Sequence, residues 1–532
     1  MQLQVISNRA TDQDAYVPPR KSWRRLLRRM LVLFALLAVP FGGATVLAAS
    51  AGAAVGTFSY TPNLHPLGFS DRVVPLDNNV PGQSIINSDL AFWGRLAFQG
   101  TYDGFRIIDI SSPSNPFEII NYTGCSGGTT VGNQGDVLVW QNLLIRSWNS
   151  PVSAGSAATA SCGGQLVGQG FEGLSIFDIS NPASPVLIKN LRMASDTVPT
   201  GCGSHTATLV PDVARGNVYV YNSGSSGACP GIDIVKIPLG NPASAAFLRR
   251  EPAGRSCHDT GVILGEVNLI SCAGGNGFTV WSFDPSIDAP AVGSIEDPVQ
   301  LYSRSITGVT IGHSAAFTWD GEVLIFGHEP GGGTQARCQA SSSLVDRTLF
   351  FFEARTGALL GQFVQPRPQT SLENCTWHNY NVVPTDKRYV LVSGNYQMGI
   401  SVIEFTNPAN AYEVAYADPA PLVNPNNPAA IETGGDWSTY WYNGRIYESD
   451  ITRGLIIWNL SSNITAGSYT FDHLNPQTQE TSFPFKGTAF GRNRAADQQG
   501  MAIFGESAAD DVSGGTGSDE GFSGDGDGYA SE

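Results

Sequence analysis

The chain has 532 residues, with 61 glycines, 32 prolines, 14% charged residues and a formal net charge of −16. An acidic chain without a basic stripe repels phosphate backbones, which excludes nucleic acid as an expected partner. Abundant glycine and proline are typical of many short strands joined by tight turns, and they argue against a helical solenoid.

The first 53 residues have the pattern of an export signal. A basic run from Arg24 to Arg29 precedes an apolar stretch from Leu31 to Leu47, and small residues follow up to Ala54. We expect cleavage of residues 1–53, so that the protein is secreted or held at the cell surface. The alternative is an uncleaved anchor, because the apolar stretch approaches the length of a bilayer span. Such an anchor would be the chain's one contact with a membrane. Residues 54–80 are then expected to form an N-terminal extension.

One unit recurs every ~45 to 70 residues through the rest of the chain. Gly104 to Pro113 returns as Gly173 to Pro182. Each copy has a glycine, then a run of β-branched and aromatic residues that suits a buried strand, and then a turn with Ser and Pro. Weaker copies begin at Gly231, Gly277, Thr348, Gly399 and Gly454.

Two further strands precede each copy, and four antiparallel strands per unit predict a propeller blade. The sequence therefore predicts an all-β fold, a β-propeller of seven blades over residues 81–485, with six or eight blades as alternatives. The acidic tail at 486–532 is rich in Gly, Ser and Asp and is expected to be disordered. The seven hairpins that start the blades open at Asp89, Asp136, His205, His258, His313, His378 and Asp436.

The repeats resemble those of the LVIVD-repeat proteins, whose consensus is a glycine, an apolar strand of the Leu-Val-Ile-Val-Asp type and a Ser-x-Pro turn. Gly104 to Pro113 and Gly173 to Pro182 carry the resemblance, which extends in weaker form over roughly residues 80 to 475. It implies a β-propeller that is secreted or lies at the cell surface. The family shares no single activity, so the resemblance implies the fold rather than the function.

Eight cysteines, all after residue 120, agree with an exported protein stabilised by disulfides. Cys257 precedes the first strand of a predicted hairpin and Cys272 ends the second, so the two should lie side by side and form a disulfide. Pairing the others in sequence order is one of many possible arrangements. It joins Cys125 with Cys162, Cys202 with Cys229, and Cys338 with Cys375.

Four of the seven histidines open consecutive predicted blades: His205, His258, His313 and His378. The first strand of each blade lines the channel of a propeller, so we expect these imidazoles to face one another at one mouth. Neutral imidazole is a common ligand for iron, copper and zinc. The sequence therefore suggests a transition metal at this mouth, iron or copper before zinc.

Further residues are expected around this cluster. His328 should end the second strand of the blade that His313 opens, and Asp259, Glu329, Asp136 and Asp436 are acidic neighbours that could orient an imidazole or move a proton. The two remaining histidines, His65 and His473, fall outside the pattern and are expected at the surface.

Two functions of different classes fit these features. The first is an exported binding module, whose mouth and rim bind an extracellular protein or glycan while the histidines only line a wet channel. The second is a metal-dependent oxidoreductase that acts on a small molecule at the mouth. It is similar to the histidine-ligated propeller oxygenases and oxidases by analogy of fold alone. No sequence motif for a known catalytic mechanism decides between them.

Overall fold

A computed structural model describes residues 58–72, 86–127, 134–193, 202–224, 229–283, 293–424 and 426–487. The export signal predicted at 1–53 and the acidic tail beyond residue 487 lie outside these ranges. Among the described residues no helix is long and apolar enough to cross a membrane.

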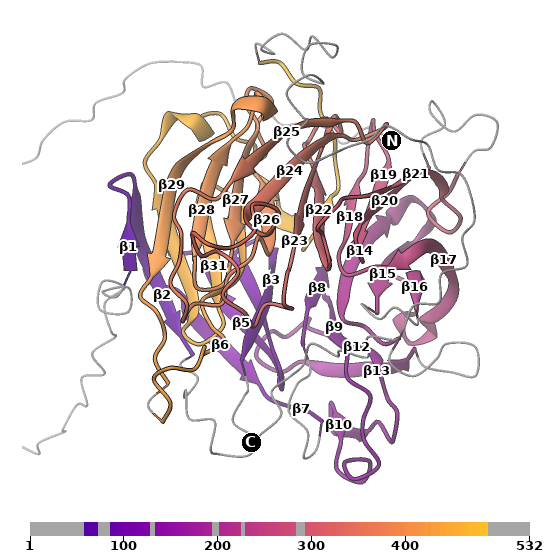
Figure 1. The fold of residues 1–532 in the computed structure, drawn as a ribbon. Coiled ribbons are helices and arrows are strands. Elements are labelled where there is room, and N and C mark those ends of the chain that lie inside the picture. Colours follow the sequence, from indigo (N-terminus) through magenta and orange to yellow (C-terminus); the bar gives the residue numbers. More distant parts are fainter. Residues whose placement is uncertain are drawn as a thin grey trace, which may run out of the picture. The chain divides into compact units, whose positions relative to one another are not determined.

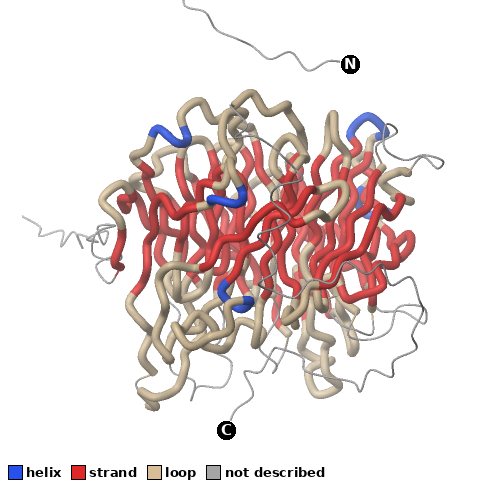
Figure 2. The backbone as a smooth tube through the Cα atoms, turned by 45° about the horizontal axis from the view of Figure 1, so that its top comes forward, coloured by secondary structure: helices blue, strands red, loops and turns tan. Residues whose placement is uncertain are grey.

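Strands form nearly all of the regular structure (Figure 2), and they assemble into seven sheets of four or five strands and one small sheet of three. From the inner to the outer strand, the main sheets are β3 (Asn87–Trp93), β4 (Leu96–Thr101), β5 (Gly104–Asp109) and β6 (Phe117–Tyr122); β8 (Val137–Trp140), β9 (Leu143–Trp148), β12 (Gly173–Asp178) and β13 (Val186–Arg192); β14 (Thr206–Asp212), β15 (Asn217–Ser223), β16 (Pro230–Pro238) and β17 (Ala246–Ser256); β18 (Thr260–Ile263), β19 (Leu269–Gly274), β20 (Gly277–Ser282) and β21 (Val299–Ser305); β22 (Gly312–Phe317), β23 (Val323–His328), β24 (Thr348–Glu353) and β25 (Leu359–Val364); β26 (Asn379–Val382), β27 (Val390–Gly394), β28 (Ile400–Glu404) and β29 (Tyr412–Pro419); and β30 (Asp436–Tyr442), β31 (Arg445–Asp450), β32 (Gly454–Leu460) and β2 (Leu64–Asp71).

The remaining elements are short. Strands β1 (Phe58–Tyr60), β33 (His473–Leu474) and β34 (Thr478–Gln479) extend main sheets, and β7 (Cys125–Ser126), β10 (Ser161–Cys162) and β11 (Gln165–Leu166) form the small one. The 3-10 turns are η1 (Val213–Arg215), η2 (Pro242–Ser244), η3 (Val345–Arg347), η4 (Pro408–Asn410) and η5 (Asn463–Thr465).

The sheets follow one another in a closed cycle. The inner strands β3, β8, β14, β18, β22, β26 and β30 each contact the next, and β30 contacts β3. Apolar side chains fill the space between neighbouring sheets, as where Phe98 and Ile107 meet Leu144 and Phe177. This is a β-propeller, as predicted, and each sheet is called a blade and named here by its inner strand.

An N-terminal strand completes the last blade. β2 pairs with β32 from Leu64 opposite Leu460 to Asp71 opposite Gly454, and Figure 1 shows the indigo β2 beside the orange and yellow strands of the chain's end. The extension predicted at 54–80 is therefore in part a strand of the propeller. Sequence analysis missed it because Pro66 and Gly68 interrupt its apolar pattern, and the pairing is irregular between these two residues.

The recurring unit is the third strand of a blade with the turn that follows it. A Cβ atom on Gly104 would lie 1.7 Å from the carbonyl oxygen of Tyr122 on the outer strand, so only glycine fits there. At the other end, Asp109 Oδ1 accepts a hydrogen bond from the Ser111 N–H at 2.8 Å. The same bond, from Ser180 N–H to Asp178, closes the second copy at 2.8 Å.

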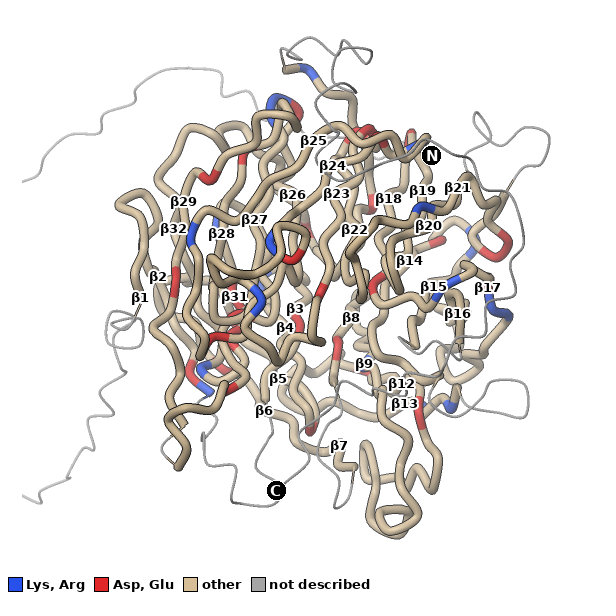
Figure 3. The backbone as a smooth tube through the Cα atoms, in the orientation of Figure 1, with Lys and Arg blue, Asp and Glu red and all other residues tan. Residues whose placement is uncertain are grey.

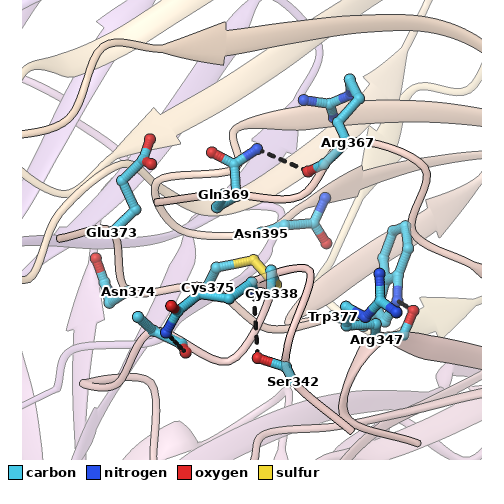
Figure 4. The surroundings of a disulfide bond; sticks show 12 residues. Cys338, Ser342, Arg347, Arg367, Gln369, Glu373, Asn374, Cys375, Trp377 and Asn395 are labelled. Carbon is cyan, nitrogen blue, oxygen red and sulfur yellow. Dashed lines mark hydrogen bonds between the residues drawn. A yellow bond between two sulfur atoms is a disulfide. The ribbon is translucent and has the colours of Figure 1, made fainter. Parts of the chain in front are cut away.

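All four cysteine pairings predicted from sequence order are present, with Cα–Cα distances of 3.9 to 5.7 Å. Figure 4 shows the Cys338–Cys375 disulfide close to Trp377, whose indole N–H donates to the carbonyl oxygen of Arg347 at 2.9 Å. Lys and Arg positions are dispersed in the view of Figure 3 and form no continuous stripe there.

Candidate functional site

The seven residues predicted to open the blades all lie within two positions of the first residue of an inner strand. Because the inner strands form a closed cycle, these positions divide the mouth into two arcs. The histidine arc spans four consecutive blades and consists of His205, His258, His313 and His378. The aspartate arc spans the other three and consists of Asp436, Asp89 and Asp136.

The four imidazoles of the histidine arc contact one another in sequence. Ring centroids are 4.4 Å apart for His205 and His258, 3.9 Å for His258 and His313, and 4.2 Å for His313 and His378. His258, His313 and His378 are buried, and His205 is half-buried. The structure thus brings together the four histidines that the sequence placed on one mouth.

Hydrogen bonds at Nδ1 fix the tautomers of two of these rings. His378 Nδ1 lies 2.6 Å from the carbonyl oxygen of Trp437, which only accepts, so Nδ1 carries the proton. His258 Nδ1 lies 3.0 Å from the Asp259 carboxylate, which likewise makes it a donor. In both neutral rings the lone pair is therefore on Nε2.

His313 has the same tautomer. Its Nδ1 is 2.7 Å from Ser314 Oγ, and that hydroxyl lies 2.5 Å from Asp259 Oδ2 and 2.7 Å from the carbonyl oxygen of His378. The hydroxyl proton points to one of these two acceptors, so the oxygen accepts from His313 Nδ1–H. Asp259 Oδ2 is a second acceptor for this Nδ1, at 3.5 Å.

His205 differs from the other three. Asn149 Oδ1 accepts hydrogen bonds from the Gln134 N–H at 3.1 Å and the Ser150 hydroxyl at 3.5 Å, which turns its Nδ2 toward His205 Nδ1 at 3.2 Å. An amide N–H only donates, so His205 carries its proton on Nε2 and donates it to His258 Nε2 at 2.8 Å. His205 is therefore placed to cap the arc rather than to present a lone pair.

Glu329 brings a carboxylate to the same place. One ligand atom each of His258, His313 and Glu329 lie within 4.8 Å of one another, a spacing that a single ion could bridge. Glu329 Oε1 is also 3.9 Å from His378 Nε2 and accepts a hydrogen bond from the Tyr396 hydroxyl at 2.5 Å. The Tyr396 ring packs against His378 with centroids 4.3 Å apart.

Two residues predicted for the cluster are not part of it. His328 is fully buried, and its Nε2 bonds to the carbonyl oxygen of Val345 at 2.8 Å, away from the other histidines. Successive side chains of an extended chain point to opposite faces, so Glu329 at the mouth forces His328 to the other side. Asp436 is fully buried beneath the mouth and accepts a hydrogen bond from the Thr439 hydroxyl.

The other predicted neighbours are at the mouth. Asp136, Asp259 and Glu329 line a pocket of ≈ 970 Å³ together with the four histidines of the arc, and Tyr102, Tyr396 and Trp437 form part of its wall. Of the two histidines expected at the surface, His65 is exposed. His473 is half-buried and stacks on Trp93 with centroids 4.4 Å apart.

Burial moves the pKa values of the two arcs in opposite directions. It lowers the pKa of His205 and of His313 well below the usual value, helped by the neighbouring histidines, and lowers that of His378 to about 4. Burial also raises the pKa of Asp89 to about 6 and that of Asp136 well above its usual range, with nearby carboxylates adding to the effect. His205, His313 and His378 are therefore neutral at pH 7, the state in which imidazole binds metals.

Sequence analysis missed several residues that support the site: Asn149, Ser314, Asn379, Tyr396 and Gln477. Two of them carried a signal, because a polar residue directly follows each histidine of the arc. These residues bond to the next blade, as where Ser314 Oγ approaches the carbonyl oxygen of His378 and Asn379 Nδ2 donates to that of Trp437 at 3.3 Å. Nothing in the sequence around Asn149, Tyr396 or Gln477 indicates their role.

Fold and site together define a β-propeller with a histidine cluster at the mouth of its channel. Residues 89–124 and 167–192 match the LVIVD repeat, which confirms the resemblance predicted from Gly104 to Pro113 and Gly173 to Pro182. A propeller built from repeats is a fold suited to an interaction scaffold. No curated protein matches the sequence.

Several solved propellers are similar in part. The propeller of Dos1 is 10% identical in sequence, and the match covers 75% of this chain and 79% of the Dos1 chain, with a TM-score of 0.39. The WD40 propeller domain of Doa1 is 11% identical, covers 75% and 98%, and has a TM-score of 0.41. The Cps50 (Swd1) propeller domain of Myceliophteria thermophila is 11% identical, covers 73% and 99%, and has a TM-score of 0.39.

Proposed function

We propose that this protein binds a transition-metal ion, iron or copper, at the channel mouth and uses it to oxidise or reduce a small molecule in the pocket. The observation that carries the proposal is the shared tautomer of His258, His313 and His378. Each donates Nδ1–H to an acceptor of the protein, so each has its lone pair on Nε2, and the lone pair of His258 becomes free for an ion once the His205 Nε2–H turns away from it. Bonds to the second nitrogen are the usual way in which proteins orient metal-binding imidazoles.

Electrostatics favours a cation here over a merely polar lining. The rings of His258, His313 and His378, with neighbouring centroids 3.9 and 4.2 Å apart, carry their lone pairs on Nε2 in one buried region, next to the Glu329 carboxylate. Concentrating partial negative charge away from water is unfavourable unless a positive charge compensates it. His258, His313 and His378 would hold the ion, and Glu329 would add an oxygen ligand or accept a proton.

The bound ion would supply the electron-transfer chemistry, and the protein's own residues would position the reacting molecule. The pocket beside the arc is large enough for a small organic molecule and has aromatic walls. The Tyr396 hydroxyl, bonded to Glu329, is a proton donor beside the proposed ligands. We also propose that the protein works after export, which the four disulfides support because such bonds persist in oxidising compartments.

Elemental analysis of the purified protein tests the metal proposal. We expect close to one iron or copper per chain in the wild type, and loss of that metal in a His258→Ala/His313→Ala double variant. His65→Ala, at an exposed histidine outside the arc, is the matched control and should keep the metal. Little metal in the wild type, or equal amounts in the wild type and the double variant, would overturn the proposal.

The second candidate is an exported binding module that holds an extracellular protein or glycan without a metal. It is favoured by the match to the LVIVD repeat, because a repeat propeller suits a scaffold role. A wild type without metal that still captures a glycan or protein ligand at the pocket would favour this candidate. Loss of that capture in Trp437→Ala, at the pocket wall, would locate the binding.

A further inference from the structure

The chain does not end with the last blade but returns into the propeller's channel. After β32, residues 472–487 run past the inner strands of several blades. β33 pairs with the inner strand β3, and β34 pairs in parallel with the inner strand β18. Pro476 and Gln477, between these two short strands, line the pocket at the mouth. The C-terminal segment is therefore part of the site's wall.

Polar side chains anchor this segment to two more blades. Asn475 accepts a hydrogen bond from the Val139 N–H at 2.7 Å and donates one to the Val139 carbonyl oxygen at 2.9 Å. Thr478 donates its hydroxyl to the carbonyl oxygen of Leu209 at 2.8 Å. The segment thus contacts the inner strands β3, β8, β14 and β18, and its position relative to the mouth is fixed from four sides.

Gln477 is the residue that joins the segment to the histidine arc. Its Nε2 donates to Asp259 Oδ2 at 3.1 Å and to Asn379 Oδ1 at 2.9 Å. These two acceptors fix the orientation of the amide, and its buried Oε1 has no hydrogen-bond partner within the described part of the chain. The backbone of Gln477 is left-handed, with φ of 57°, a conformation that is unfavourable for a residue other than glycine.

The two groups that Gln477 holds support all three proposed ligand imidazoles. Asp259 accepts from His258 Nδ1 and lies next to His313 Nδ1. Asn379 directly follows His378 and donates to the carbonyl oxygen of Trp437, which is the acceptor of His378 Nδ1. One amide from a distant part of the sequence thus bridges the supports of three blades.

We propose that Gln477 is a positioning residue of the metal site, which sets the directions of the three imidazoles through Asp259 and Asn379. This inference rests on the proposed function and adds to it the source of the site's geometry. The left-handed backbone is maintained because it aims the amide at both acceptors.

Binding of Co²⁺, whose visible spectrum reports ligand geometry, tests this role in the full chain. Gln477→Gly relieves the left-handed backbone but leaves Asp259 Oδ2 and Asn379 Oδ1 without the amide donor, so the melting temperature of the metal-free protein should stay the same or fall. We expect its Co²⁺ affinity to fall about tenfold and its visible bands to shift, as for other residues that orient metal ligands. Gln477→Met keeps the side-chain length, removes the donors and should give the same loss.

Asn475→Ala is the matched control in the same segment. It leaves the Val139 backbone groups unpaired, so its melting temperature should fall while its Co²⁺ affinity and spectrum remain those of the wild type. Wild-type affinity and bands in both Gln477 variants would overturn the positioning role alone. No Co²⁺ binding by the wild type would instead overturn the proposed metal site, and the positioning role with it.

Discussion

The histidine arc and the aspartate arc occupy equivalent places in the same propeller, yet their chemistry is opposite. Both lie at the starts of inner strands, and burial is the largest influence on the pKa of both. It keeps the histidines uncharged by lowering their pKa, and it favours uncharged aspartates by raising theirs. Burial thus lowers the charge of both arcs, because it favours the uncharged form of an imidazole as well as that of a carboxyl group.

The disulfides are also distributed unequally between the histidine arc and the aspartate arc. Cys202 lies three residues before His205, Cys257 directly precedes His258, and Cys375 lies three residues before His378. No disulfide is as close to a member of the aspartate arc, and the nearest, Cys125–Cys162, ties a loop between two blades. The covalent restraints are therefore concentrated where a metal site needs fixed directions, and the aspartates depend on packing and hydrogen bonds.

The largest expected effects on stability come from removing a disulfide, either the one next to His258 or the one nearest in sequence to the aspartate arc. Cys257→Ala/Cys272→Ala opens a bond that spans 15 residues, which should lower the free energy of unfolding by about 3 kcal/mol. Cys125→Ala/Cys162→Ala, with a span of 37 residues, should cost about 4 kcal/mol. Urea unfolding measures both. Metal affinity distinguishes the two variants, because only Cys257–Cys272 lies next to a histidine of the arc, so only its removal should weaken metal binding. An equal loss of affinity in both variants would contradict the division.

The two arcs should affect the pH dependence of stability in opposite directions. The folded state holds the Asp89 proton more tightly than the unfolded chain, so this stabilisation is full below pH ~4 and is lost as the pH rises toward 6. The folded state disfavours protonation of His378, so stability is lost as the pH falls from ~6.5 toward 4. Each of these two titrations changes the free energy of unfolding by about 3 kcal/mol over its pH range.

Asp89→Asn removes the titration of Asp89 and so isolates its contribution to the pH dependence of stability. The amide oxygen can still accept from the Leu90 N–H and the Tyr440 hydroxyl, which now bond to Asp89 Oδ1 at 2.7 and 2.8 Å. As the pH rises from 4 to 7, the free energy of unfolding of the variant should therefore increase by about 3 kcal/mol relative to that of the wild type, as measured by urea unfolding. A constant difference across this range would show that Asp89 does not titrate with a raised pKa.

Metal binding distinguishes the arcs most directly. His313→Ala removes the central imidazole of the histidine arc, and affinity for Co²⁺ should fall at least about a hundredfold, measured by equilibrium dialysis. Asp136→Asn, at the mouth but in the aspartate arc, should change the affinity less than about threefold, because burial raises the pKa of Asp136 and favours its uncharged carboxyl group, which an amide resembles. Equal losses in the two variants would mean that the ion lies between the arcs.

The sequence could predict much of this arrangement because the repeat sets the register. Once Gly104 and Gly173 mark the third strand of a blade, the residues that open each blade follow by counting, and the histidines fall on one mouth. The same counting failed for His328, because it does not tell which face of a strand a side chain takes. Glu329, one residue on, is the one that faces the mouth.

The supports of the site could not be predicted because they depend on contacts between distant parts of the chain. Gln477 reaches Asp259 across 218 positions, and β2 joins β32 from the opposite end of the sequence. Neither segment carries the glycine and the apolar run of the repeat. A search by repeats therefore finds the blades and overlooks the two terminal segments that complete them.

The smallest expected effect comes from substituting two matched tyrosines, one that bonds beside the histidine arc and one that bonds to the aspartate arc. The Tyr396 hydroxyl donates to Glu329 at 2.5 Å beside the histidines, and the Tyr440 hydroxyl donates to Asp89 at 2.8 Å among the aspartates. Each Tyr→Phe substitution removes one buried hydrogen bond and should lower the free energy of unfolding by about 1 to 2 kcal/mol. Only Tyr396→Phe should also shift the visible bands of bound Co²⁺, because Glu329 then loses the donor that orients its carboxylate toward the proposed ion. If Tyr440→Phe shifts the bands as much, the aspartate arc takes part in binding the metal, and the two arcs form a single site.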